Sequence, residues 1–230
     1  TDADPPDPSQ KPVCTEEEQR YLIDFANQYF AKALSRDDIV WTYSGLRPLF
    51  DDGQGNPSAV TRDYVFDVDE TGGAPLLNIF GGKITTFRRL AEAAMDKAAP
   101  FFPGMKEDWS AGIPLPGGNF PVDGVNVLID GLRADFPFLD AKWAERMVRA
   151  YGTEARDILG EANQAADLGR DFGATLTEAE VRHLMRHEFA VTAEDVLWRR
   201  TKLGLRVDAE QVAALEAFMS EARAERAAAE

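Results

Sequence analysis

The residues with the clearest chemical potential form a short glycine-rich segment, FGGKITT at positions 80–86. An apolar run ends at Phe80 and a helical pattern follows Lys83, so Gly81 and Gly82 occupy a predicted strand-to-helix turn. Glycines let the backbone approach a ligand closely, and the N–H groups at a helix N-terminus favour an anionic or electron-rich atom. The pattern therefore indicates a turn that faces an anion or a cofactor.

Two other interpretations of this turn can be weighed against a ligand-binding role, and only the second remains open. A nucleotide-binding P-loop also has Gly-Lys followed by Thr, but it needs a glycine five residues before Gly82, where this chain has Leu77. The second alternative is an ordinary strand-to-helix turn with a solvated Lys83. The pattern alone does not separate this alternative from a ligand-binding turn.

Two arginines accompany Lys83. Arg47 follows one predicted strand and Arg62 opens the next, so the three cations at adjacent strand ends could gather a phosphate group. Alternatively, each arginine pairs with a nearby carboxylate, and Asp63 and Asp67 lie close to Arg62 in sequence. Both interpretations stay open at this point.

The two histidines, His183 and His187, are four residues apart on a predicted helix. This spacing can hold Zn²⁺, but a metalloprotease helix needs Glu directly after the first His, and Leu184 is there instead. A structural role is favoured for both histidines, and no metal site is predicted. The basic run 199–202 is interpreted as structural or domain-docking.

Composition narrows the function further. The chain has 230 residues, with 25 Lys and Arg against 40 Asp and Glu, which gives a net charge of −15. So acidic a surface repels polyanions, which disfavours nucleic-acid binding. Cys14 is the single cysteine, so no internal disulfide is possible. The sequence has no apolar run near the 18 residues that a transmembrane helix needs.

Five elements are predicted to position the candidate residues. Thr15 and Glu18 form a capping box that opens a helix over 15–34. Strands are predicted at 39–45, 61–68 and 76–80, because β-branched and aromatic residues are frequent there and turn residues separate them. A helical pattern then continues to about residue 99.

The remainder of the chain differs in character. Residues 104–121 are rich in proline and glycine and are interpreted as a linker. Four or five helical patterns follow, with predicted capping boxes that begin at Thr177 and Asp208. The predicted fold class is α+β, with a mixed part over 1–103, the linker over 104–121 and an all-helical part over 122–230.

Several segments resemble one enzyme family over nearly the whole chain. SRDDIVWTYSGLRPL at 35–49, AVTRDY at 59–64 and FGGKITTFR at 80–88 resemble the FAD-dependent sn-glycerol-3-phosphate dehydrogenases. LPGG at 115–118, DLG at 167–169 and the segment 187–204 resemble the C-terminal helical cap of that family.

The resemblance implies a fold and a site. Residues 1–103 would be a remnant of the flavoprotein substrate-binding and FAD-domain sheet, and 122–230 the all-α C-terminal cap domain. Arg47 and Lys83 would be catalytic, and Arg62 would join both in binding the substrate. The cofactor-facing turn would comprise Gly81, Gly82, Lys83, Ile84 and Thr85.

The resemblance also implies an activity, oxidation of sn-glycerol 3-phosphate to dihydroxyacetone phosphate with FAD as cofactor and quinone as acceptor. Because the chain contains no G-x-G-x-x-G pattern after a strand, the dinucleotide-binding half is expected to be missing and the isolated chain to be inactive. The expected location is cytoplasmic, peripheral on the inner face of the cytoplasmic membrane. A homodimer is also expected. The alternative function is a helical docking, dimerisation or membrane-surface module without catalysis of its own.

Overall fold

The structure is a computed structural model that describes residue 7 and residues 9–50 and 61–229. The chain divides into two compact units, Thr1–Ile113 and Pro114–Glu230. The first unit combines helices with a two-stranded sheet and the second is helical, so the predicted α+β class is confirmed. None of the described helices is both long and apolar enough to cross a membrane.

Helix α1 spans Glu16–Ala26 and begins with the predicted capping box. The Thr15 hydroxyl accepts from the Glu18 N–H at 3.2 Å, and the Glu18 carboxylate accepts from the Thr15 N–H at 2.8 Å. The prediction of a helix to residue 34 is wrong. Asn27 ends α1, because its side-chain amide donates to the Leu34 carbonyl at 3.0 Å and accepts from the Leu34 N–H at 2.7 Å.

The sheet of the described residues is a two-stranded antiparallel hairpin. Strand β1 covers Tyr64–Asp69 and β2 covers Leu76–Gly81, with Tyr64 opposite Gly81. These strands confirm the predictions at 61–68 and 76–80. The predicted strand at 39–45 is wrong, because its residues belong to no strand of the described chain and Val40 stays 85% exposed. Arg47 therefore does not follow a strand.

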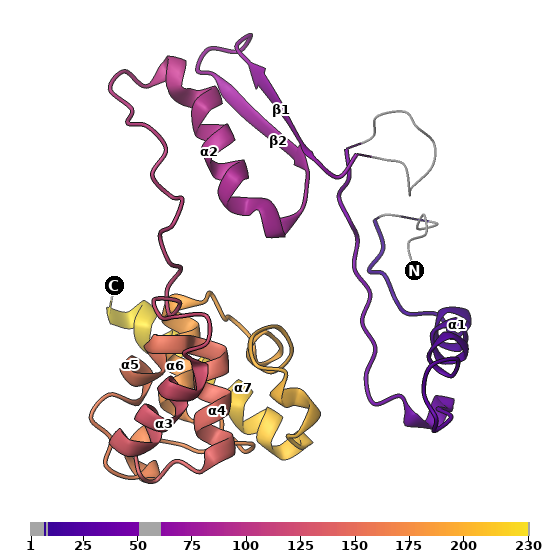
Figure 1. The fold of residues 1–230 in the computed structure, drawn as a ribbon, viewed down its shortest axis with the longest axis vertical. Coiled ribbons are helices and arrows are strands. Elements are labelled where there is room, and N and C mark those ends of the chain that lie inside the picture. The colour runs from indigo at the N-terminus through magenta and orange to yellow at the C-terminus, as the bar shows by residue number, and fades with distance from the viewer. Residues whose placement is uncertain (1–6, 8, 51–60, 230) are drawn as a thin grey trace. The chain divides into compact units, whose positions relative to one another are not determined.

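Helix α2, Phe87–Ala98, follows β2 after the 3₁₀ turn Ile84–Thr86 and packs along the hairpin (Figure 1). Its end agrees with the helical pattern that the sequence showed to about residue 99. A second 3₁₀ turn, Ala99–Phe101, closes the helix. The hairpin and α2 thus hold the glycine-rich turn between them.

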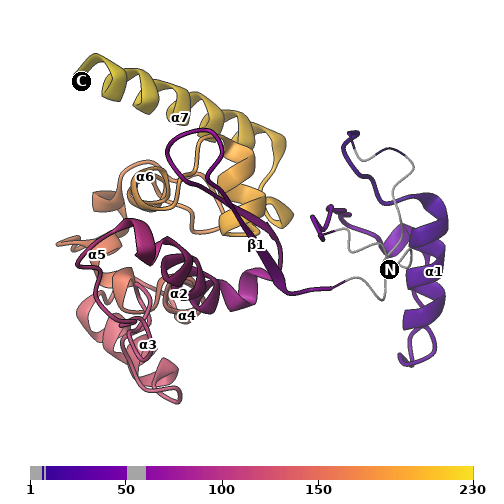
Figure 2. The same cartoon turned by 90° about the horizontal axis from the view of Figure 1, so that it is seen from above.

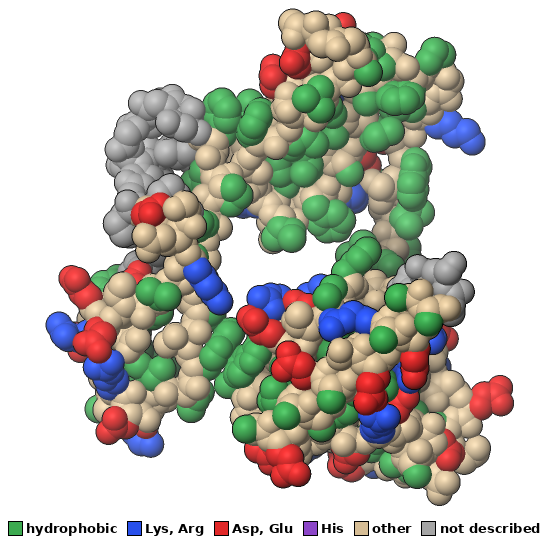
Figure 3. All heavy atoms as spheres, turned by 180° about the vertical axis from the view of Figure 1, so that it is seen from behind, with side chains coloured by type: hydrophobic (Ala, Val, Ile, Leu, Met, Phe, Trp, Pro, Cys, Tyr) green, Lys and Arg blue, Asp and Glu red, His purple; other side chains and the backbone are tan. Residues whose placement is uncertain are grey.

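The first unit has no fully buried side chain among its described residues, since every buried residue lies at or beyond Leu132. Large apolar side chains are instead exposed on its elements, and Figure 3 shows them gathered over the hairpin part of the chain. The exposed side chains of the hairpin and α2 include Leu76, Ile79, Phe80, Phe87 and Met95. In and after α1, Tyr21, Phe25 and Phe30 are exposed as well. Exposure of this extent is typical of a surface that another part of a protein covers.

The second unit has a complete core of its own. Its α-helices are α3 (Val125–Asp135), α4 (Ala141–Tyr151), α5 (Ala155–Leu159), α6 (Glu178–His187) and α7 (Ala209–Ala229), with a π-helix over Asp195–Arg200. Helix α7 is the long rod in Figure 2. The most buried core side chains are Leu132, Met147, Leu176, Leu184, Leu197, Leu215 and Met219. The predicted capping box at Asp208 is confirmed. The Asp208 carboxylate accepts from the Gln211 N–H at 2.9 Å, and the Gln211 side-chain carbonyl accepts from the Asp208 N–H at 3.0 Å.

A buried polar cluster joins α4 to α6. The Glu180 carboxylate is 1% exposed and accepts two hydrogen bonds from Arg146, each 2.7 Å long, and one from the Tyr151 hydroxyl at 2.6 Å. Burial, followed by the charge of Glu180, holds the pKa of Tyr151 above its ordinary value. The predicted capping box at Thr177 is therefore wrong, because Glu180 turns inward and the Thr177 side chain makes no capping hydrogen bond.

Candidate functional site

The glycine-rich turn is fixed by the packing of the first unit. Gly81 and Gly82 have φ angles of +69° and +82°, which side chains rarely tolerate. A Cβ atom on Gly82 would lie 2.0 Å from the Tyr64 ring, and one on Gly81 would lie 3.1 Å from the Phe50 backbone nitrogen. The glycines are thus required by neighbouring residues of this chain, rather than only by a ligand as the sequence suggested.

Polar contacts hold the next residues of the turn. The Tyr64 hydroxyl donates to the Lys83 carbonyl. The Thr86 hydroxyl lies 2.8 Å from the Tyr64 oxygen and 2.9 Å from the same carbonyl, and the Thr86 N–H also donates to this carbonyl at 3.1 Å. The Lys83 carbonyl is therefore held in one direction by Tyr64 of β1 and by Thr86, the last residue of the 3₁₀ turn.

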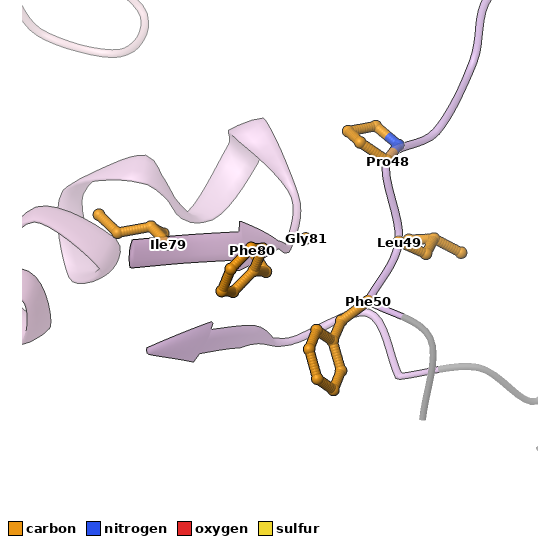
Figure 4. Close-up of a pocket in the computed structure, with 6 residues that line it drawn as sticks. All are labelled: Pro48, Leu49, Phe50, Ile79, Phe80 and Gly81. Atoms are coloured by element: carbon orange, nitrogen blue, oxygen red, sulfur yellow. The ribbon is translucent and has the colours of Figure 1, made fainter. Parts of the chain in front are cut away.

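An open hollow lies beside the turn. It is lined by Pro48, Leu49, Phe50, Ile79, Phe80 and Gly81. Figure 4 shows the Pro48–Phe50 segment running past the end of β2, and the rings of Phe50 and Phe80 lie 5.9 Å apart between centroids. The hollow gives an apolar wall next to the polar backbone of the turn, which suits a ligand with a flat apolar body and polar edges.

The three predicted cations lie on segments next to the paired residues Tyr64 and Gly81, at one end of the hairpin. Arg62 lies two residues before Tyr64 and Lys83 two residues after Gly81, and Tyr64 and Gly81 are paired. Arg47 directly precedes Pro48, which lines the hollow with Gly81. Lys83 and Arg47 are exposed and Arg62 is half-buried. Their joint action on a phosphate stays a prediction.

The cofactor-facing residues are accessible. Gly81 and Gly82 are half-buried, whereas Lys83, Ile84 and Thr85 are exposed, with Ile84 87% exposed. The side chain of Lys83, the N-cap residue, makes no capping hydrogen bond to the 3₁₀ turn Ile84–Thr86. Its first N–H groups and the Lys83 ammonium together give a locally positive edge.

The histidines occupy a different environment, in the second unit. The rings of His183 and His187 lie 4.9 Å apart on α6, and His183 packs edge-on against Tyr151. Burial, followed by the nearby His187, holds the pKa of His183 below its ordinary value. Among the described residues, no group of three or more His, Cys, Asp or Glu could hold a metal ion.

The basic run also makes local contacts. Arg199 pairs with Glu194 at 2.9 Å and with Asp195 at 3.1 Å. Arg200 donates to the Glu188 carbonyl at 2.9 Å. These bonds support the structural interpretation of the segment 199–202.

Comparison with known proteins then identifies the second unit. Residues 109–227 match the family model described as the C-terminal domain of alpha-glycerophosphate oxidase, which covers more than half of the chain. The chain belongs to this family. The recognition made from the sequence motifs is confirmed.

Curated relatives of the glycerophosphate oxidase family match most of this chain. It is 50% identical over 204 residues to D-erythritol 1-phosphate dehydrogenase of Brucella abortus, which covers 88% of the chain and 41% of that protein. It is 45% identical over 207 residues to the aerobic glycerol-3-phosphate dehydrogenase of Escherichia coli, covering 90% of the chain and again 41% of the relative. A glycerol-3-phosphate dehydrogenase of Pseudomonas aeruginosa is 43% identical over 196 residues. The chain thus spans about two fifths of the length of these relatives.

The residues at the turn fit a flavin. The positive edge formed by Lys83 and the Ile84–Thr86 turn matches the electron-rich pyrimidine edge of the ring system, and the apolar hollow beside Gly81 matches its flat body. Sequence reasoning missed two residues that shape this site, Tyr64 and Phe50. The only signal for Tyr64 was its position, because the hairpin register places this aromatic ring opposite the glycine pair.

Proposed function

We propose that this chain is the C-terminal part of a flavin-dependent polyol-phosphate dehydrogenase, with sn-glycerol 3-phosphate as substrate and quinone as electron acceptor. The observation that carries the proposal is the turn Gly81–Gly82–Lys83, which stands beside an open apolar hollow in a chain of the glycerophosphate oxidase family. The names of the relatives in Escherichia coli and Pseudomonas aeruginosa support the substrate and the oxidoreductase class.

The residues of this chain bind and orient the substrate. Lys83 and Arg62 attract the phosphate group, and Arg47, which directly precedes the hollow-lining Pro48, joins them in binding the substrate. The positive edge of the turn stabilises negative charge that develops when an adjacent electron acceptor is reduced. Bound FAD would supply the hydride acceptor for the oxidation at C2 of glycerol 3-phosphate, and with release of the C2 hydroxyl proton to water the product would be dihydroxyacetone phosphate.

The substrate is tested with the longer protein that contains this chain and a dinucleotide-binding half. Purified protein with bound FAD is expected to reduce a soluble quinone analogue when glycerol 3-phosphate is added. D-Erythritol 1-phosphate should be assayed in parallel, because the relative with 50% identity is named for it. A protein that binds flavin but oxidises neither polyol phosphate would refute the proposal.

The role of Lys83 is tested by Lys83→Met in the same protein. Loss of one charge-assisted contact to phosphate is expected to raise KM about tenfold or more, since hydrogen bonds to charged groups contribute ~1.5–3 kcal/mol. Lys97→Met is the matched control, because Lys97 is an exposed lysine in the last turn of α2. Equal kinetic constants for both variants would remove Lys83 from the site.

The 230-residue chain by itself is expected neither to retain FAD nor to turn over. The reason is that the site described above supplies one edge of a flavin pocket but no pyrophosphate-binding turn. The measurement is flavin absorbance after mixing the chain with FAD and removing free flavin by gel filtration. Stoichiometric retention of flavin would contradict this expectation.

A second candidate function is a docking, dimerisation or membrane-surface role of the helical unit. It is favoured by Phe189, which is 86% exposed at a φ of +57°, and by the adjacent Val191, which is 54% exposed. Arg200 and Arg223 bond the carbonyls of Glu188 and Val191, so the exposed loop is held in place. Co-sedimentation of the chain with liposomes tests membrane association, and Phe189→Ser is expected to weaken it. Sedimentation velocity reports whether the chain forms dimers.

A further inference from the structure

We propose that Tyr64 is a positioning residue, which sets the direction of the Ile84 N–H group at the cofactor-facing edge. This inference rests on the proposed function and assigns a role to a residue outside the predicted site. Tyr64 acts through its ring and through its hydroxyl, and the two act on successive residues of the turn.

The ring of Tyr64 determines where the turn runs. It lies so close to Gly82 that a Cβ atom there would come within 2.0 Å of two ring carbons. Because Tyr64 and Gly81 are opposite each other in the ladder, the ring covers the glycine pair across the two strands. The ring thus supports one side of the Gly81–Gly82 backbone.

The hydroxyl of Tyr64 determines how the next peptide plane is oriented. It donates to the Lys83 carbonyl, which the Thr86 N–H also approaches at 3.1 Å. The described peptide bonds are all trans, and in a trans peptide the C=O and N–H of one plane point in opposite directions. Holding the Lys83 carbonyl toward Tyr64 therefore turns the Ile84 N–H away from Tyr64.

This orientation matters for the electrostatics of the site. A backbone donor stabilises developing negative charge only when it is aimed at that charge before the reaction. Without the Tyr64 hydroxyl, the Lys83 carbonyl keeps only its two bonds from Thr86, so the peptide plane is held less firmly and part of the population presents a tilted N–H. Tyr64 thereby favours the reduced over the oxidised form of a flavin bound at this edge.

The hydroxyl and the ring can be separated by substitution. Tyr64→Phe retains the ring over Gly82 and removes only the bond to the Lys83 carbonyl. Tyr21→Phe is the matched control, because Tyr21 is a half-exposed tyrosine of α1, outside the hollow and the turn. A third variant, Thr86→Val, removes the other hydroxyl that touches the Lys83 carbonyl.

The first measurement needs no cofactor. In the ¹⁵N-labelled 230-residue chain, Tyr64→Phe is expected to shift the Ile84 amide resonance, because the peptide group that joins Lys83 to Ile84 loses one of the hydrogen bonds that orient it. Tyr21→Phe is expected to leave the Ile84 resonance in place. An Ile84 amide that is identical in Tyr64→Phe and in the unsubstituted chain would overturn the inference.

The second measurement uses the longer flavin-containing protein. Tyr64→Phe is expected to reduce the preference for reduced over oxidised flavin about fivefold, which is a fall of about 20 mV in midpoint potential for a two-electron couple. The turnover number should fall while KM for glycerol 3-phosphate stays constant, because Lys83 and Arg62 are unchanged. Thr86→Val should act in the same direction.

The outcomes separate the two proposals. An unsubstituted protein without flavin or without polyol-phosphate oxidation refutes the proposed function. If that protein is active but Tyr64→Phe leaves the midpoint potential and the turnover number unchanged, the function stands and the role of Tyr64 is refuted. Equal flavin content and equal far-UV circular dichroism in all variants ensure that a fall in activity is not a loss of folding.

Discussion

Removal of the Glu180 carboxylate should destabilise the helical unit strongly. In Glu180→Ala, the Arg146 guanidinium loses two bonds of 2.7 Å and Tyr151 loses one of 2.6 Å, at a place where the carboxylate was 1% exposed. Burial by itself would lower the pKa of Arg146 and its bond to Glu180 raises it. Because an arginine guanidinium is effectively always protonated in proteins, Arg146 stays charged when Glu180 is removed. Breaking a buried pair in this way typically costs about 3–5 kcal/mol.

The assay is urea unfolding of the 230-residue chain, followed by the circular dichroism of its helices. In thermal unfolding, the expected loss of stability for a unit of this size corresponds to a fall in Tm of roughly 10–20 °C. Glu145→Ala is the matched control, because Glu145 bonds Arg149 at 2.8 Å while both side chains are about half-exposed or more. That pair should contribute less than about 0.5 kcal/mol.

Two results bear on the reasoning. A loss of unfolding free energy below about 1 kcal/mol in Glu180→Ala would show that the cluster does not stabilise the contact between α4 and α6 as its geometry indicates. The double variant Arg146→Met with Glu180→Leu should recover part of the lost stability, because apolar replacement of both partners leaves no buried charge. If the double variant is no more stable than Glu180→Ala, then lost packing, rather than the uncompensated charge of Arg146, accounts for the loss of stability.

Three further predictions concern pH, the turn and the first helix. The pKa of His183 is lowered in the folded chain from its ordinary 6.5, so the unfolded chain binds the proton more readily and stability should fall as pH drops below about 6.5; urea midpoints at pH 7.5 and 5.5 should differ less in His183→Phe. Gly82→Ala should disrupt the hairpin by at least about 1–2 kcal/mol, because of its φ of +82° and the Tyr64 ring, whereas Gly72→Ala, where a Cβ meets nothing within 4 Å, should not; the loss of β1–β2 amide protection reports the difference. Thr15→Ala should weaken α1 by about 1 kcal/mol, visible as lost amide protection over its first turn.

Local signals in the sequence predicted the elements whose partners are near in sequence. The capping box of Thr15 needs only Glu18, three residues away, and the β1–β2 hairpin needs only a short turn. Glu180 shows the limit of such signals. Its spacing from Thr177 fits a cap, but Arg146, 34 residues earlier, offers a bidentate pair in the core, and this tertiary contact outweighs a surface cap.

The strand predicted at 39–45 failed for a related reason. Strand propensity measures how well side chains fit a pleated, half-buried surface, and it needs a partner strand to act on. Val40 and Tyr43 remain 85% and 79% exposed, so neither packing nor pairing fixes a strand there in this chain. The candidate site was predicted in its residue types from the motif, whereas Tyr64 was missed because its role depends on contacts 19 and 22 residues away.

Stability and chemistry are separated along this chain. Among the described residues every buried side chain lies in the helical unit, so a substitution such as Glu180→Ala is expected to change the stability of that unit. The hairpin unit carries the candidate site and, over its described residues, has no core of its own. Its turn is ordered by a few specific contacts instead, the ring of Tyr64 over Gly82 and the hydroxyl bond to the Lys83 carbonyl. Few contacts make each one decisive, which is why a single hydroxyl in β1 is expected to alter the electrostatics of the site while the fold of the helical unit remains unchanged.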